Sequence, residues 1–217
     1  MGFDLCRKDV FKILSSPITL YHWHTEPTLI GGILFVAWIY AVLLGAYRTK
    51  HFPTLPFPKT RVFCFSSGLV IFYLAVGSPL DPLGENFLFF AHMIQHNILM
   101  YISPPLVLLG LPPEFLDRFL SRRPVIEVLF KFFCHPIIAG LLFTVIFSFW
   151  HIGVFYEAAL RDKTIHMAEH LTMFFASVLM WWPICSESKR VPAISYGPQM
   201  LYVCLLYTSP SPRDEQS

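Results

Sequence analysis

Hydrophobic and polar residues alternate along this chain in long blocks. Five of the blocks are apolar, free of charge over most of their length, and separated by polar stretches that are rich in proline or charge. A helix needs about 20 residues to cross the ~30 Å hydrocarbon core of a bilayer. We therefore predict five transmembrane helices, which occupy residues 28–47, 62–76, 87–109, 136–156 and 164–183.

Both ends of the chain differ from these blocks. Residues 1–27 mix apolar positions with Arg7, Lys8 and Lys12, which is typical of an extracytoplasmic or interfacial segment and not of a cleavable signal peptide. A sixth apolar block, 198–206, is too short to span and runs into a polar tail rich in Pro and Ser. We expect the tail, 207–217, to be non-native and the natural sequence to continue as apolar residues. The transmembrane domain is then 28–206, an all-α polytopic bundle with five full spans and a truncated sixth.

Composition agrees with a membrane protein. Hydrophobic residues make up 55% of the chain and charged residues only 14%, where a soluble domain carries about 25%. The net charge of +2 gives no indication of nucleic-acid binding, and the five cysteines form no CxxC pair.

The positions of Lys and Arg predict which ends of the spans face the cytoplasm. The first, third and fifth loops, at 48–61, 111–135 and 184–197, carry ten of these residues, whereas the second and fourth loops carry two. Because cytoplasmic loops are enriched in Lys and Arg, we place the odd loops inside and the N-terminus outside.

Two spans carry the same unusual motif. One reads HMIQH at 92–96 and the other HMAEH at 166–170. Residues four apart lie on one face of a helix, so each motif pairs two imidazoles, with Gln95 or Glu169 beside them. The predicted topology puts both pairs in the outer halves of their spans. Three further histidines fall on the outer side, His22, His24 and His151, and two on the cytoplasmic side, His51 and His135.

This arrangement is typical of a metal site. Neutral imidazole is the commonest protein ligand for transition metals, and buried polar groups without a partner destabilise a membrane span. We predict that copper or zinc binds four histidines, with a fifth as a further ligand and with Gln95 and Glu169 orienting the rings: His92, His96, His166, His170 and His151. The neighbouring Met93 and Met167 could add thioethers, which favour Cu(I).

Other interpretations use the same residues. The cluster could be a hydrogen-bonded core, or the facing histidines could ligate haem in a redox protein. The segment His166-x-x-Glu169-His170 fits a short zinc-protease pattern, but HMIQH contains no general base. Pro104-Pro105, which we expect to kink or break the third span, could belong to a transporter.

Three stretches together resemble a known family. AHMIQHNILMYISPPLVLLGLPP, WHIGVFYEAAL and IHMAEHLTMFFASVLMWWPI are similar to the multi-span CtaG family of cytochrome c oxidase assembly factors, over roughly 79–206. The matching signature positions are His92, Gln95, His96, Pro104, Pro105, Trp150, His151, His166, Glu169 and His170. Gly153 stands where the family usually has proline.

The resemblance implies a non-enzymatic role in maturing a haem–copper oxidase in the bacterial plasma membrane, through about seven spans. Together with the histidine pattern it leads us to expect copper delivery near the outer face, with bis-His haem binding as the alternative. The expected partners are subunits of cytochrome c oxidase, the lipid bilayer and an extracytoplasmic copper carrier, but not nucleic acid.

Overall fold

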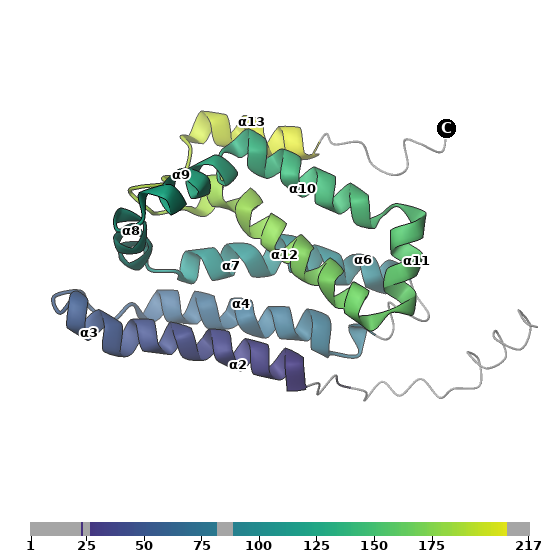
Figure 1. Ribbon diagram of the computed structural model, residues 1–217, viewed down its shortest axis with the longest axis horizontal. Coiled ribbons are helices and arrows are strands. Elements are labelled where there is room, and N and C mark those ends of the chain that lie inside the picture. Colours follow the sequence, from purple (N-terminus) through teal and green to yellow (C-terminus); the bar gives the residue numbers. More distant parts are fainter. Residues whose placement is uncertain (1–22, 24–26, 82–88, 208–217) are drawn as a thin grey trace, which may run out of the picture.

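Every regular element that the structure describes is a helix. The computed structural model describes residue 23 and residues 27–81 and 89–207, and it has no strand within these ranges (Figure 1). This confirms the predicted all-α fold. The N-terminal segment up to residue 26, apart from Trp23, and the expected non-native tail from residue 208 lie outside the described residues.

The first two predicted spans form two long helices. Helix α2 (Pro27–Val42) continues through a π-helical turn, η1 (Leu43–Tyr47), into α3 (Arg48–His51). The first helix is therefore five residues longer than predicted, one at its start and four at its end, and it ends just before Pro53. Helix α4 (Lys59–Gly77) begins directly after Pro58.

The third predicted span is one continuous helix built from α6 (Phe89–Asn97), a π-helical turn η2 (Ile98–Ile102) and α7 (Ser103–Gly110). We expected Pro104-Pro105 to kink or break it, and the helix is not broken there. Pro104 has no N–H to donate to the carbonyl of Met100, four residues earlier. The indole Nε1 of Trp181 donates to that carbonyl instead, at 2.9 Å, so the proline leaves no unsatisfied acceptor there.

The stretch 111–135, which we predicted to be a polar connection, contains two short amphipathic helices. These are α8 (Pro113–Ser121) and α9 (Pro124–Phe133). Each begins with a proline, the residue best suited to the first helical position because its missing N–H has no partner there in any case. Sharp bends of 76° and 66° separate α8 and α9 from the long helices before and after them.

The fourth predicted span is shorter than expected. Helix α10 (Pro136–Trp150) ends at a turn, and α11 (Gly153–Arg161) covers the end of the predicted span and most of the predicted loop, 157–163. Only Asp162 separates α11 from α12 (Lys163–Cys185), because its carboxylate accepts the backbone N–H groups of Thr164 and Ile165, at 2.7 and 3.2 Å, and caps the new helix. Helix α13 (Tyr196–Tyr207) contains the sixth apolar block.

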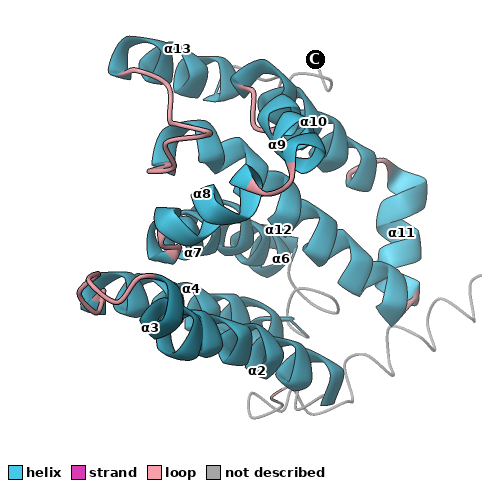
Figure 2. Ribbon diagram, turned by 60° about the vertical axis from the view of Figure 1, so that its left-hand side comes forward, coloured by secondary structure: helices cyan, strands magenta, loops and turns pink. Residues whose placement is uncertain are grey.

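The long helices stack side by side, with α2 and α4 in one layer, α6, α7 and α12 in the middle, and α10 and α13 beyond them (Figures 1 and 2). Helix α4 approaches α7 most closely at two glycines. A Cβ on Gly110 would lie 2.6 Å from the backbone N of Phe65, and one on Gly68 would lie 2.7 Å from Val107. The Tyr40 hydroxyl donates to the Gly110 carbonyl at 2.7 Å and ties α2 to the same contact.

One apolar core lies where η2, α10, α12 and α13 meet. Trp150, at the end of α10, donates through Nε1 to the Thr172 hydroxyl of α12, at 2.8 Å. The buried apolar side chains of this core are Met100, Phe143, Trp150, Met173, Ala176, Met180 and Tyr202. This packing holds α12 against α10 and the π-helical turn η2.

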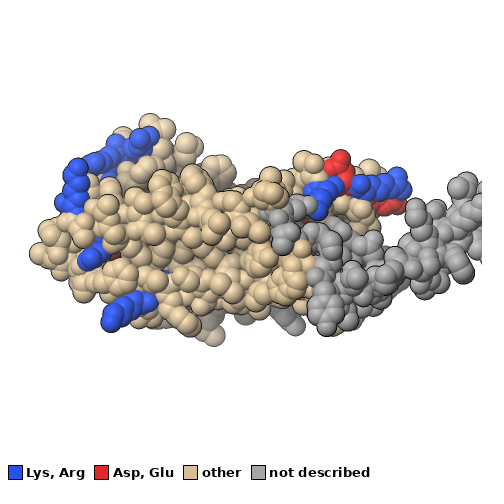
Figure 3. Space-filling model, turned by 90° about the horizontal axis from the view of Figure 1, so that it is seen from below, with Lys and Arg blue, Asp and Glu red and all other residues tan. Residues whose placement is uncertain are grey.

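The surface fits a membrane protein. On the face shown in Figure 3, Lys and Arg lie at the end formed by the loop after α3 and by α8 and α9, charges of both signs lie at the opposite end, and the surface between is uncharged. Among the described residues, two helices are long and apolar enough to span a membrane, or up to four if each bent pair is one span. The predicted count of five spans therefore stays a prediction. Helix α12 has 23 residues, enough to span, but its His and Glu residues lower its mean hydropathy.

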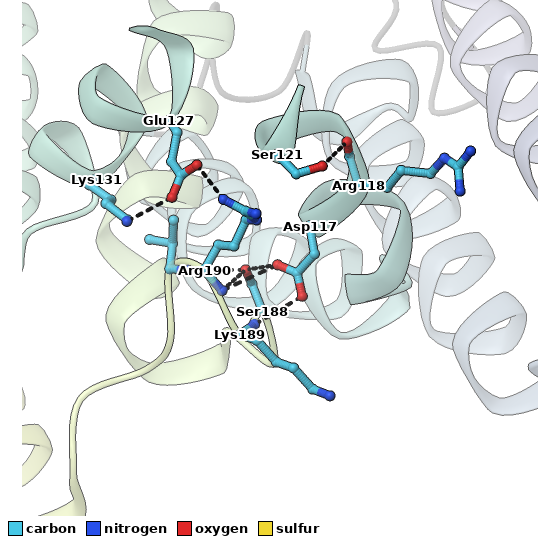
Figure 4. A network of polar contacts seen from close by, with 9 residues as sticks. Asp117, Arg118, Ser121, Glu127, Lys131, Ser188, Lys189 and Arg190 are labelled. Atoms are coloured by element: carbon cyan, nitrogen blue, oxygen red, sulfur yellow. Dashed lines mark hydrogen bonds and ion pairs between the residues drawn. The ribbon is translucent and has the colours of Figure 1, made fainter. Parts of the chain in front are cut away.

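A polar network holds the basic end together (Figure 4). Asp117 on α8 accepts hydrogen bonds from the Ser188 hydroxyl, at 2.5 Å, and from the backbone N–H of Lys189, at 3.1 Å. The Arg190 guanidinium donates to Glu127 on α9 at 2.6 Å, and Lys131 donates to the same carboxylate at 2.7 Å. The loop that follows α12 is therefore attached to both short helices.

Candidate metal centre

Two helices present matching polar faces near their first turns. Helix α6 carries His92, Gln95 and His96, spaced three and four residues apart, so all three point to one side. Each of these side chains is at most 1% exposed. The π-helical turn η2 follows directly, and such turns are frequent at functional sites.

Helix α12 repeats this face with His166, Glu169 and His170. All three are buried, the most exposed being His166 at 4%. The capping carboxylate of Asp162 fixes where α12 begins, and therefore the turn of the helix on which these residues fall. Both helices start at the same end of the bundle, so the two faces lie at similar depth (Figure 1).

The two faces meet. The ring centroids of His96 and His170 are 5.3 Å apart, and those of His92 and His166 are 6.1 Å apart. Within each helix the paired rings are 4.1 and 4.2 Å apart. The Nε2 atom of His96 lies 3.8 Å from a carboxylate oxygen of Glu169. The structure thus brings the four histidines of the two motifs into one cluster.

His151 reaches the same cluster from the end of α10. Its ring centroid is 5.9 Å from that of His96. Its Nδ1 lies 2.7 Å from the carbonyl oxygen of Phe147, which can only accept, so Nδ1 carries the proton. The lone pair is then on Nε2, which is buried and has no hydrogen-bond partner among the described residues. This tautomer is the one in which Nε2 can ligate a metal.

The sequence interpretation missed Asp81. It follows α4 by four residues, in a stretch that we treated as a loop, yet it is only 6% exposed. Gln95 Nε2 donates to its Oδ1 at 2.5 Å, so the amide that we expected to orient an imidazole holds a carboxylate. The only signal in the sequence was an acidic residue in a loop that has no Lys or Arg.

The ligand atoms fall into two groups. The carboxylate of Asp81 and one nitrogen each of His166 and His170 lie within 4.8 Å of one another, and so do those of His92, His96 and Glu169. A tetrahedral ion with bonds of about 2.0 Å needs ligand atoms roughly 3.3 Å apart. Small side-chain rotations would therefore close either group around an ion, and the residues present fit a transition metal.

Several of these buried atoms make no hydrogen bond within the described part of the chain. They are both carboxylate oxygens of Glu169, both ring nitrogens of His96 and the Nε2 of His170. A buried polar atom without a partner costs roughly 1–3 kcal/mol, and more if it is charged. Bound metal cations would give these side chains partners.

Other candidate residues lie elsewhere. Met167 is 46% exposed and so does not face the buried cluster. His51 ends α3 at the basic end of the molecule, where its Nδ1 lies 3.2 Å from the Arg118 guanidinium, and His135 is exposed at the start of α10. His22 and His24 are outside the described residues. Tyr156 of α11, which the sequence did not single out, packs edge-on against His92 with ring centroids 5.7 Å apart.

Comparison with known proteins identifies a family. The family model for the cytochrome c oxidase caa3 assembly factor, Caa3_CtaG, matches residues 38–208, which include all the residues of the cluster. No curated protein and no solved structure matches the chain. The family resemblance predicted from the histidine and proline motifs is confirmed, over a longer stretch than those motifs covered.

Proposed function

Because the chain belongs to the cytochrome c oxidase caa3 assembly factor family, we propose that it serves oxidase assembly by binding copper at its histidine cluster and passing it to the oxidase. The ligands are His92, His96, His166 and His170, with His151 as a further ligand. Glu169 and Asp81 supply negative charge beside them. The protein acts as a metal donor and not as an enzyme.

The observation that carries this proposal is the meeting of two matching faces. A single buried histidine is commonly a packing residue, but four imidazoles with ring centroids 4.1 to 6.1 Å apart form a set of donors for a metal ion. Imidazole with carboxylate suits copper or zinc. An oxidase of the haem–copper class needs copper, which favours copper here.

The geometry is less suited to the alternatives. A bis-His haem needs a flat macrocycle between its two ligands, whereas the rings of α6 and α12 already pack against one another. A protease needs an accessible water beside its metal and a general base, but Glu169 is only 1% exposed. A small ion satisfies the same side chains without separating the helices.

The proposed setting is the bacterial plasma membrane, with the N-terminus and the cluster toward the outer face. The cluster lies at the end of the bundle opposite the basic end, which the distribution of Lys and Arg assigns to the cytoplasm. An extracytoplasmic copper carrier could load it there, and an oxidase subunit in the same membrane could receive the ion.

The proposal is tested by complementation of cells that lack this protein. The double variant His96→Ala/His170→Ala should leave oxidase activity and copper content of the oxidase at the level of the deletion strain. The matched control, His51→Ala/His135→Ala, removes two histidines at the basic end and should restore both. Full oxidase maturation by the first variant, at normal protein abundance, would show that the histidines only pack.

A further inference from the structure

The buried carboxylates of the cluster divide its ligands between two ions. We propose that Asp81, His166 and His170 hold one divalent transition-metal ion, and that His92, His96 and Glu169 hold a second beside it. This inference rests on the proposed function, in that it takes the cluster to bind metal. To the proposed function it adds the number of ions, their charge state, and Asp81 as a ligand outside the two histidine motifs.

The two groups are independent sets of three. Each consists of two imidazoles and one carboxylate, whose ligand atoms lie within 4.8 Å of one another, and no residue belongs to both. Every member is at most 6% exposed. Two histidines and one carboxylate are a common protein set for a divalent ion, with the remaining positions open to further ligands.

The groups are also adjacent. His96 of one group faces His170 of the other with ring centroids 5.3 Å apart, and His92 faces His166 at 6.1 Å. Ions held in both would lie close enough to influence each other, as in two-metal sites, where the ions are about 3.5–4 Å apart. His151 is positioned next to His96 and can complete that side of the site.

The charge of Glu169 argues against a single ion held by the Asp81 group. A buried carboxylate needs a cation or a set of donors, because its desolvation is costly. Asp81 has a donor in Gln95, but Glu169 accepts no hydrogen bond within the described part of the chain and lies 3.8 Å from the nearest His96 nitrogen. An ion held by the Asp81 group alone would leave Glu169 without a cation, so the Glu169 group requires an ion of its own.

The donor atoms indicate the class of ion. Each group offers two imidazole nitrogens and one carboxylate oxygen. Such donors favour Cu(II), Zn(II) or Co(II) over Cu(I), which prefers sulfur. The two-ion site therefore takes up copper in its oxidised form.

The test uses the full chain purified in detergent, stripped of metal, loaded with excess Cu(II) and desalted. Metal analysis should give two Cu(II) ions per wild-type chain. Asp81→Asn, whose amide oxygen still accepts from Gln95, should hold one, and so should Glu169→Gln. Glu157→Gln removes an exposed carboxylate that pairs with Arg161 at the same end of the bundle, and it should keep two.

Paramagnetic resonance gives a second readout that does not depend on any substitution. Two neighbouring Cu(II) ions in the wild type should be magnetically coupled and give a weak half-field signal, whereas each one-ion variant should give the spectrum of an isolated Cu(II). One uncoupled ion per wild-type chain, or loss of both ions from Asp81→Asn alone, would overturn the two-ion inference and leave the proposed function standing. A wild-type chain that binds no Cu(II), Zn(II) or Co(II) would contradict both.

Discussion

At the scale of single residues, Asp162 shows how one side chain determines the geometry of the site. It is the only residue between α11 and α12, and its carboxylate accepts the N–H groups of Thr164 and Ile165. These hydrogen bonds hold the pKa of Asp162 below its ordinary value, because they stabilise the ionised form. The cap thus sets the first turn of α12, on which His166 lies.

The lowered pKa makes the contribution of this cap depend on pH. A carboxylate whose pKa is lower in the folded state stabilises the fold above its unfolded pKa, and the contribution is lost as pH falls through the folded value. Asp162→Ala should therefore lower the melting temperature in detergent at pH 7, and the difference from wild type should shrink below about pH 4. Asp162→Asn, which can still cap, should retain most of the stability. An equal loss for Ala and Asn at neutral pH would contradict the capping role.

Residue by residue, the sequence predicted the cluster unevenly. The i, i+4 spacing on a helix is a local property, so HMIQH and HMAEH were enough to align each pair of imidazoles. The contribution of Asp81 depends on how the segment after α4 folds against α6, and no periodicity encodes that. For the same reason, the sequence could not show that the amide of Gln95 donates to Asp81.

At the scale of helices, small residues determine how closely the layers pack. Gly68 and Gly110 let α4 lie against α7 without room for a methyl group, and Ser103 on α7 donates to the Gly68 carbonyl at 3.0 Å. Membrane helices associate through such close backbone contacts, because burial of apolar surface offers them no gain over lipid. The α4–α7 pair therefore depends on shape more than on hydrophobicity.

This packing predicts the effect of one methyl group. The Cβ of Gly110→Ala would lie 2.5–2.7 Å from the Cβ, backbone N and Cα of Phe65, which cannot move without shifting α4. The substitution should destabilise the protein by about 1–3 kcal/mol, seen as a lower melting temperature in detergent. Gly31→Ala, where an added Cβ meets nothing within 4 Å, is the matched control and should have little effect. Equal stability of the two variants would contradict the close-packed α4–α7 interface.

The predicted helix boundaries differ from the structure where contacts between distant parts of the chain determine them. The sequence could not predict that the helix is unbroken at Pro104-Pro105, because Trp181, which bonds to the free carbonyl of Met100, is 81 residues away in sequence. The stretch 111–135 was predicted to be a loop because it contains several charged residues. These residues form the polar faces of the amphipathic helices α8 and α9. Helix α10 ends and α11 begins at the turn around His151, whose Nδ1 bonds to the backbone carbonyl of Phe147.

At the scale of the whole molecule, charge separates the two ends. The basic end carries the network of Asp117, Glu127 and Arg190 (Figure 4). The cluster lies toward the opposite end, where α6 and α12 begin (Figure 1). This separation was predictable, because the loop in which a Lys or Arg falls is visible in the sequence once the apolar blocks are assigned.

The separation predicts the orientation in the membrane. A reporter inserted next to Asp81 should read as extracytoplasmic, and one inserted in the loop after α3, near Pro56, should read as cytoplasmic. Protease protection of the two fusions in intact cells and in inverted vesicles measures both. A cytoplasmic signal from the fusion near Asp81 would place the cluster at the inner face and remove the proposed route from an outer copper carrier.

The most direct test of the account is the metal content of the protein itself. Wild-type protein and His96→Ala/His170→Ala should be purified in parallel from membranes of copper-supplemented cells, and copper, zinc and iron measured per chain. We predict stoichiometric copper in the wild type, with nitrogen and oxygen neighbours at about 2.0 Å by X-ray absorption, and its loss in the double variant. A wild-type protein that carries haem iron with a Soret band and no copper, or a double variant that keeps its copper, would contradict the assignment of this cluster as a copper site.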